Sequence, residues 1–288
     1  MARLAVVGVG RIGGGVAYLS ASLGIVDELI LYDTAPDLLK AQVLDIEHTG
    51  LDMAISTDKN EVKDADICIL SAGLPRNPSV KTRADLLEAN LPAVKDCTAL
   101  LKGFEGILIT VTNPMDINNF YLCKKTGMAR ERCIGFGGQL DSARFGIALR
   151  NRNIRGFPFV LGEHGEHQVP AFSRLDEPVD EGIRNEILAE LRGASMEVIR
   201  GKGGTVFGPT LHLAHLVRMV LTDTRDLAIC SAVLDGEFGI TGCSLGVPAR
   251  IGRDGIHAIE EWHLDPWERR KMDEAGSFAR ELSSRAVS

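Results

Sequence analysis

Short apolar runs rich in β-branched residues alternate with longer amphipathic patterns through the first half of the sequence. Runs of this kind are typical of strands that are buried on both faces of a sheet. They are RLAVVG (3–8), ELILYD (28–33), DICILSA (66–72) and GILITVTN (106–113). Between them the residue spacing predicts helices near 13–23, 36–49, 84–102 and 114–126. Strand–helix alternation predicts a parallel, doubly wound sheet with right-handed crossovers.

The pattern changes after about residue 138. We predict a helix near 139–150, a strand at FPFVLG (157–162), helices near 183–200 and 209–222, short strands near 228–234 and 245–252, and a closing helix from 265 to about 284. The Gly-rich DGEFGITGCSLG between the short strands indicates an antiparallel hairpin region. The expected fold class is therefore α/β, with a Rossmann dinucleotide-binding domain over 1–137 and a second, α+β substrate domain over 138–288. Because no low-complexity linker separates them, the two domains should share a large interface.

A glycine-rich loop, VVGVGRIGGG, follows the first strand and opens the first helix. Gly8, Gly10 and Gly13 satisfy G-x-G-x-x-G, in which the glycines permit a tight turn, close approach of a pyrophosphate and close helix packing. Asp33 ends the second strand, where its carboxylate can accept hydrogen bonds from both ribose hydroxyls. The same carboxylate would repel a 2′-phosphate, which favours NAD over NADP. The alternative is that Asp33 only begins the turn before Pro36.

Candidate substrate-binding side chains follow the later strands. The segment SAGLPRNPSVKTRADLLEAN (71–90) holds Arg76 and Arg83 on a loop at the sheet edge where ligands bind. Such guanidiniums suit carboxylate capture and carbonyl polarisation, although solvated surface arginines are an equally good interpretation. VTNPMD (111–116) places Asn113 at the same edge, where a helix cap is the simpler alternative. In GGQLDSARF (137–145), Asp141 and Arg144 share one helix face, which also fits a mutual salt bridge.

The stretch VLGEHGEHQV (160–169) fits half of a metal site, a proton shuttle or a polar loop. His164 and His167 are spaced to share a face only on a helix, and here the backbone is extended or turning, so chelation by the pair is not expected. HLAH (212–215) has helical spacing without a nearby third ligand, which is typical of core or interface histidines. We interpret His164 as a group that titrates near neutral pH. His167, Glu163 and Glu166 are interpreted as ordinary loop residues.

Five motifs occur in a fixed order: the glycine fingerprint with Asp33, AGLPR…TR, VTNPMD, QLDSARF and GEHG. In this set the chain resembles the lactate/malate dehydrogenase family over essentially its whole length. The resemblance implies hydride transfer between NADH and a 2-oxo acid. His164 is then the proton donor and acceptor, held by Asp141, while Arg83 polarises the reacting carbonyl. Arg144 binds the substrate carboxylate as a bidentate fork, and Asn113 orients the carbonyl and the nicotinamide ring.

The resemblance also assigns substrate choice to Arg76, because in the family an arginine at this position goes with dicarboxylic substrates and a glutamine with lactate. The expected activity is therefore that of a malate dehydrogenase. The loop departs from the family pattern, since it is one residue longer between its arginines and carries Ser79 where glycine is usual. The complete set of expected cofactor-binding residues is Gly8, Gly10, Arg11, Ile12, Gly13, Asp33, Asn90, Val111 and Asn113, and no metal is expected.

Alternative functions remain at this point. A lactate or other 2-hydroxy-acid dehydrogenase is the nearest. An NAD-dependent glycosidase shares the glycine loop and the general fold, but needs a metal held by Cys and His and a longer chain. A dinucleotide-sensing module would need none of His164, Asp141, Arg83 and Arg144, so their joint presence favours an enzyme.

Charge, cysteine spacing and apolar segments indicate which binding partners, cellular location and oligomeric state to expect. A formal net charge of −7 argues against nucleic acid, which requires a basic face. The six scattered cysteines lack CxxC spacing and indicate reduced thiols. Arg11 and glycines interrupt the apolar N-terminal run, so we expect neither a signal peptide nor a membrane span, and place the protein in the cytoplasm. The apolar segment 205–220 exceeds what one small domain needs and predicts a homodimer or homotetramer.

Overall fold

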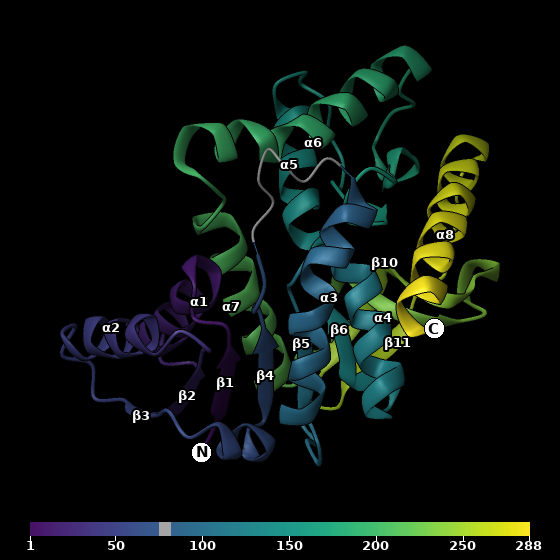
Figure 1. The fold of residues 1–288 in the computed structure, drawn as a ribbon. Helices are drawn as coiled ribbons and strands as arrows, with labels where there is room; N and C mark the ends of the chain where they lie inside the picture. The colour runs from purple at the N-terminus through teal and green to yellow at the C-terminus, as the bar shows by residue number, and fades with distance from the viewer. Residues whose placement is uncertain (75–81) are drawn as a thin grey trace.

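The first half of the chain forms a parallel sheet whose strands end at one edge. In the computed structural model, which describes residues 1–74 and 82–288, these strands run in the order β3-β2-β1-β4-β5-β6 (Figure 1). Their bounds are β1 (Arg3–Val7), β2 (Glu28–Tyr32), β3 (Ala54–Ser56), β4 (Ile67–Leu70), β5 (Ile107–Thr110) and β6 (Cys133–Gly135). Val7 pairs with both Tyr32 and Leu70, and Leu70 pairs with Thr110. The residues that follow these strands therefore meet at one edge, as the alternating pattern predicted.

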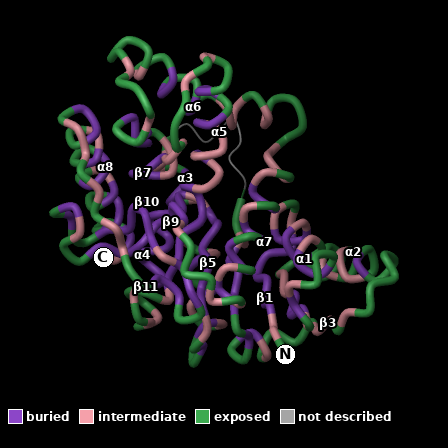
Figure 2. Tube along the Cα trace, turned by 180° about the vertical axis from the view of Figure 1, so that it is seen from behind, coloured by how far each residue is buried: buried purple, intermediate pink, exposed green. Residues whose placement is uncertain are grey.

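Helices cover both faces of this sheet. The helices of the first half are α1 (Arg11–Ser22), α2 (Pro36–Glu47), α3 (Arg83–Leu100) and α4 (Met115–Thr126), with 3₁₀ turns at Lys59–Asp64 and Arg130–Arg132. Leu4 and Val6 belong to one buried apolar cluster, whereas Ala5 and Val7 belong to another that includes residues of α3 and α4. Successive side chains of a strand point to opposite faces, so both faces of the sheet are core (Figure 2).

The second half of the chain combines antiparallel strands with long helices. Its elements are α5 (Gly138–Arg150), β7 (Val160–Gly162), β8 (Gln168–Pro170), α6 (Glu181–Lys202), α7 (Phe207–Leu221), β9 (Asp226–Asp235), β10 (Thr241–Gly252), β11 (Gly255–Ile259) and α8 (Pro266–Val287), with 3₁₀ turns at Phe172–Arg174 and Glu237–Gly239. Strand β9 pairs antiparallel with β6 through Ile134↔Ala232 and Gly135↔Ser231. The sheet thereby continues as β6-β9-β10-β7-β8, with β11 on β10, and both halves of the chain share it.

Several elements differ from the sequence predictions. Within FPFVLG only Val160–Gly162 is a strand, since Pro158 has no N–H to donate and the N–H of Phe159 bonds to the carbonyl of Phe157 instead. Strands β3, β6 and β8, each of three residues, were not predicted, nor was the five-residue β11. Strands β9 and β10 are longer than expected, at 10 and 12 residues, because they pair with each other along most of their length.

Helix α7 accounts for much of the apolar segment 205–220 inside the chain. It packs against α1, and a methyl group added at Gly15 would lie 2.8 Å from Oγ1 of Thr210. Leu213, Leu216 and Val217 are buried in the core cluster on that face of the sheet. Much of the segment is thus packed inside the chain, while Phe207 and Leu211 on its outer side remain exposed.

Two expectations from composition concern the cysteines, expected as reduced thiols, and membrane-spanning segments, of which none is expected. All six cysteines are buried and free, and burial raises the pKa of the Cys230 thiol to about 12. They are thus packed as small apolar side chains. Among the described residues, no helix is both long and apolar enough to cross a membrane.

Candidate active site

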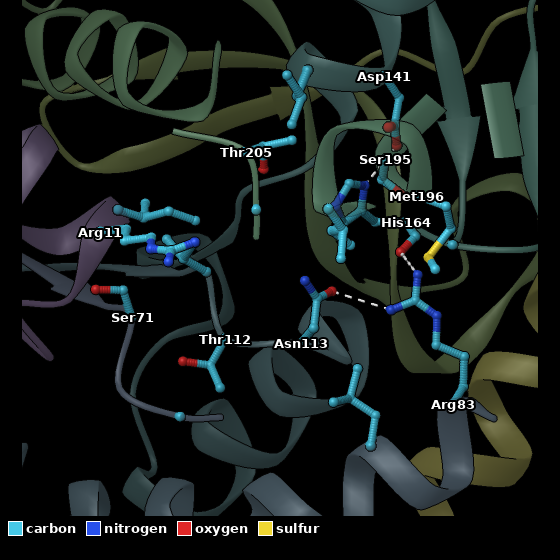
Figure 3. A pocket seen from close by; sticks show the side chains of 18 of the residues that line it. Arg11, Ser71, Arg83, Thr112, Asn113, Asp141, His164, Ser195, Met196 and Thr205 are labelled. Atoms are coloured by element: carbon cyan, nitrogen blue, oxygen red, sulfur yellow. Dashed lines mark hydrogen bonds and ion pairs between the residues drawn. The ribbon is translucent and has the colours of Figure 1, made fainter. Parts of the chain in front are cut away.

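A cavity of about 820 Å³ opens at the carboxyl edge of the parallel sheet and is lined by both halves of the chain. The first half contributes the glycine loop (Gly10–Gly13), Ser71, Arg83 and the segment Val111–Asn113. The second half contributes residues of α5, the turn between β7 and β8, and the inner face of α6 with the loop after it. Figure 3 shows Arg11 and Ser71 at one end, and His164, Arg83 and Asn113 together at the other.

The glycine loop has the shape that the fingerprint predicts. Gly8 has a φ of +90°, and a methyl group there would collide with the backbone of Ala72. A methyl group at Gly13 would collide with the carbonyl of Gly8, so the third glycine lets α1 pack against the turn. Gly10 caps α1, and a methyl group there would meet no atom of residues 1–74 or 82–288 within 4 Å. The unpaired N–H groups at the start of α1 thus face open space that suits a pyrophosphate.

Asp33 fastens this loop. Its Oδ2 accepts the N–H of Val9 at 2.9 Å, and its Oδ1 accepts the N–H of Ala35 at 2.9 Å. Asp33 and Gly8 lie outside the lining of the cavity. The alternative that Asp33 begins a turn is thus part of its role, and the carboxylate keeps further lone pairs for ribose hydroxyls.

Asn90 is buried and its side chain serves the backbone around the cavity. Its Oδ1 accepts the N–H of Leu74 at 2.6 Å, and its Nδ2 donates to the carbonyl of Asn113 at 2.8 Å. It is not among the lining residues, whereas Arg11, Ile12 and Val111 are. Asn90 therefore holds two cavity segments together.

His164 and Asp141 form a short polar contact in the site. Nδ1 of His164 lies 2.6 Å from Oδ2 of Asp141, whose side chain is buried in α5. Burial alone would lower the pKa of His164, but the charge of Asp141 and the hydrogen bond to it raise that pKa above its ordinary value. Burial would likewise raise the pKa of Asp141, but His164 and Arg144 lower it. The pair therefore favours a protonated imidazole beside an ionised carboxylate.

Two of the predicted cations, Arg83 and Arg144, lie with Asn113 at the same end of the cavity. Nη1 of Arg144 is 3.0 Å from Oδ1 of Asp141, so this carboxylate holds both His164 and Arg144. Arg83 is the first residue of α3, whose start is fixed by a capping box between Thr82 and Asp85. Nη1 of Arg83 donates to Oδ1 of Asn113 at 3.2 Å, and Nη2 donates to the carbonyl of His164.

Glu163 is not an ordinary loop acid. Its side chain is only 1% exposed, and its Oε1 lies 3.4 Å from Nε of Arg83. Its Oε2 accepts the N–H groups of Glu166 at 2.8 Å and of His167 at 3.1 Å, which fixes the turn after His164. Glu166, by contrast, is exposed as expected. The sequence gives one signal for this difference, since only Glu163 directly follows a buried strand.

His167 also has a more specific position than predicted. It lines the cavity, and its ring centroid lies 4.4 Å from that of Phe278 on α8. Asp116, in the first turn of α4, was not singled out from VTNPMD, yet it is 1% exposed and accepts the backbone N–H of His164 at 2.8 Å. The sequence carries no strong signal for this burial, since an acidic side chain in the first turn of a helix is common.

The glycine loop also contacts the end of α6, because Nη1 of Arg11 donates to the carbonyl of Lys202 at 3.1 Å.

Arg76, the residue expected to determine substrate choice, lies outside the described residues. Among residues 1–74 and 82–288, no group of three or more His, Cys, Asp or Glu side chains is placed to hold a metal ion. On α7 the ring centroids of His212 and His215 are 6.5 Å apart.

Comparison with known proteins identifies relatives of both halves. The model of the lactate/malate dehydrogenase NAD binding domain matches residues 2–135, and that of the lactate/malate dehydrogenase alpha/beta C-terminal domain matches residues 139–284. A malate dehydrogenase of Natronomonas pharaonis is 36% identical, with 96% of each chain covered. An L-lactate dehydrogenase of Priestia megaterium is 30% identical, with 99% of this chain and 96% of the relative covered.

Solved structures give the same picture. A malate dehydrogenase of Archaeoglobus fulgidus, solved in complex with NADH, superposes with a TM-score of 0.89 at 31% identity, covering 99% of this chain and 100% of that one. A lactate dehydrogenase from a deep-sea metagenome superposes with a TM-score of 0.90 at 25% identity, covering 100% and 99%.

The buried position of Glu163 generates a prediction about stability. Glu163→Ala leaves the Arg83 guanidinium, whose side chain is 12% exposed, without its carboxylate. Loss of one partner of a buried pair costs about 3 kcal/mol. Urea unfolding should therefore show a free energy of unfolding lower by this amount, while Glu166→Ala, three positions away and exposed, stays within about 0.5 kcal/mol of the unmodified protein. Equal effects of the two substitutions would contradict the assignment.

Proposed function

The chain belongs to the lactate/malate dehydrogenase family, and on that basis we propose that it interconverts oxaloacetate and malate with His164 as the acid/base group. Its first half is the NAD-binding domain of that family. The observation that carries the proposal is the convergence of the His164–Asp141 pair, Arg83 and Arg144 on one cavity with the glycine loop. A sensor of dinucleotides has no use for that set.

The residues present fit NAD. The open space at Gly10, the start of α1 and the cavity side of Val111 would hold its phosphates and nicotinamide portion, and the Asp33 carboxylate would favour NAD over NADP. Bound NADH supplies the hydride that reduces the substrate carbonyl. In our proposal the remaining work is done by side chains of this chain.

His164 moves the proton. The bond from Nδ1 to Asp141 orients the ring and leaves Nε2 to serve the substrate oxygen. A protonated His164 donates to that oxygen during reduction, and a neutral His164 accepts the proton during malate oxidation. Arg83 stabilises the negative charge that develops on the oxygen, and Arg144 binds the carboxylate next to the carbonyl.

Loss of the acid/base group should separate turnover from binding. His164→Asn should lower oxaloacetate reduction by roughly 10²–10⁴-fold, the usual contribution of a general acid. NADH binding, measured by fluorescence, should persist because it uses other residues. In the unmodified enzyme, reduction should decline as pH rises through the raised pKa of His164, and malate oxidation should increase over the same range. The matched control His257→Asn changes an exposed histidine on β11. Near-normal turnover of His164→Asn would reject its role.

Substrate choice is proposed to rest on Arg76, which lies outside the described residues. The second carboxylate of oxaloacetate would cost several kcal/mol if it were desolvated without a cation. Pyruvate has only a methyl group there, and would leave a buried arginine unpaired. Unpaired polar groups of this kind give discrimination of up to roughly 10⁴-fold.

The test compares oxaloacetate with pyruvate in steady-state kinetics. The unmodified enzyme should prefer oxaloacetate, and Arg76→Gln should lose activity with oxaloacetate and gain some with pyruvate. Arg155→Gln, a charge-matched change at an exposed position, should leave the preference as it is. A preference of the unmodified enzyme for pyruvate would overturn the malate assignment in favour of a lactate dehydrogenase.

We also propose that the chain forms a homodimer or homotetramer. Large apolar side chains remain exposed on α7 and on the two helices α1 and α5 that contact it: Phe207 and Leu211 on α7, Tyr18 on α1 and Ile147 on α5. Sedimentation at micromolar concentration should show a dimer or tetramer, and Leu211→Glu should shift it to smaller species because a charge is costly in an apolar interface. Leu51→Glu, an exposed leucine elsewhere, is the control. A monomeric unmodified protein would refute the proposal.

A further inference from the structure

Asp116 is a buried carboxylate that the mechanism above does not use. It lies in the first turn of α4 and is 1% exposed. Its Oδ2 accepts the backbone N–H of His164 at 2.8 Å, and its Oδ1 accepts the hydroxyl of Ser231 at 2.5 Å. Asp116 therefore joins the catalytic turn to strand β9 of the shared sheet.

The hydrogen bonds continue from Asp116 through the interior. Oγ of Ser231 lies 2.7 Å from Oγ of Ser244 on β10. Nδ2 of Asn119 donates to Oγ of Ser244 at 3.0 Å, and Oδ1 of Asn119 accepts the hydroxyl of Thr110 at 3.1 Å. Each of these side chains is buried. The peptide of His164 is thus held by a chain of polar contacts anchored in β5, β9 and β10.

Opposing effects act on the charge of Asp116. Burial and the nearby charge of Glu163 raise its pKa, which on balance is about 7. The hydrogen bonds from Ser231 and from the backbone of His164, and the charge of His164 itself, favour the ionised carboxylate. The N-terminal end of α4 also favours a negative charge. Among the described residues, no arginine or lysine forms an ion pair with Asp116, and its contact with His164 is made by the backbone N–H.

We propose that Asp116 is a positioning residue for His164 in the reaction proposed above: its carboxylate fixes the peptide of His164, and its negative charge favours the protonated ring. The inference rests on the proposed function. The charged groups that face His164 are Asp141 from α5, Arg83 from α3, Asp116 from α4 and Glu163 in the adjoining turn. Arg83 opposes protonation of the ring, whereas Asp141 and Asp116 support it.

The variant Asp116→Asn separates charge from shape, because an amide oxygen can still accept the N–H of His164. Because the substitution Asp116→Asn removes a negative charge, it should lower the pKa of His164. Since reduction needs the protonated ring, the decline of oxaloacetate reduction with rising pH should begin at a lower pH than in the unmodified enzyme. The KM for NADH should stay unchanged, because Asp116 is not among the residues that line the cavity.

Two serine variants extend this test: Ser231→Ala weakens the support of the carboxylate, and Ser283→Ala is the matched control. Ser231→Ala removes one of the two hydrogen bonds to the carboxylate, so the ionised form is less favoured and the pH profile should move in the same direction by a smaller amount. Ser283→Ala changes a serine on α8 that is equally buried and whose hydroxyl has no hydrogen-bond partner among the described residues. It should leave the profile in place. A shift of equal size in Ser283→Ala would overturn the proposal.

Titration of the His164 ring by NMR tests the proposal without relying on turnover. The signal is assigned by its absence in His164→Asn, and its pKa is compared in the unmodified protein, Asp116→Asn and Ser231→Ala. A lower pKa in the last two supports the proposal. An unchanged pKa overturns it, even if Asp116→Asn is less stable. A protein that reduces neither oxaloacetate nor pyruvate would reject the proposed function, while this titration would still decide the role of Asp116.

Discussion

The pairing of β6 with β9 is the contact on which the site depends. It brings an antiparallel strand from the second half of the chain against the last parallel strand of the first half. Through β10, that strand carries β7, whose end presents His164. Asn113 and the glycine loop reach the same cavity from the parallel edge. Neither half of the chain holds all of these side chains, so the cavity is complete only when both halves share the sheet.

The polar interior of the site balances its charges within a small volume. Asp141, Glu163 and Asp116 bring negative charge close to His164, Arg83 and Arg144. His164 and Arg144 each contact Asp141, and Arg83 lies beside Glu163. This pairing limits the free-energy cost of burying the charges. Asp141 has the central position because it contacts two cations with separate oxygens. Its placement in the first turn of α5 therefore orients both His164 and Arg144.

Elements with local signals could be predicted from the sequence, and those that depend on distant partners could not. The run RLAVVG and the glycines after it determine β1, the turn and the start of α1 by themselves. Strands β3, β6 and β8 are too short to show a period, and they are strands only because neighbours pair with them. The same holds in the site. His164, Asp141, Arg83, Asn113 and Arg144 stand in recognisable motifs, but the burial of Glu163 and Asp116 follows from tertiary contacts with Arg83 and Ser231.

The tight packing of α1 has a consequence for re-engineering the cofactor site. At Gly13 and Gly15 any side chain would meet the carbonyl of Gly8 or the hydroxyl of Thr210, so the inward side of this helix has almost no freedom to vary. The turn after β2 is different, since Thr34 and Ala35 are exposed. A library that seeks new dinucleotide preference is therefore best concentrated on that turn. Asp33 is the exception within it, because its replacement also removes the acceptor that holds Val9.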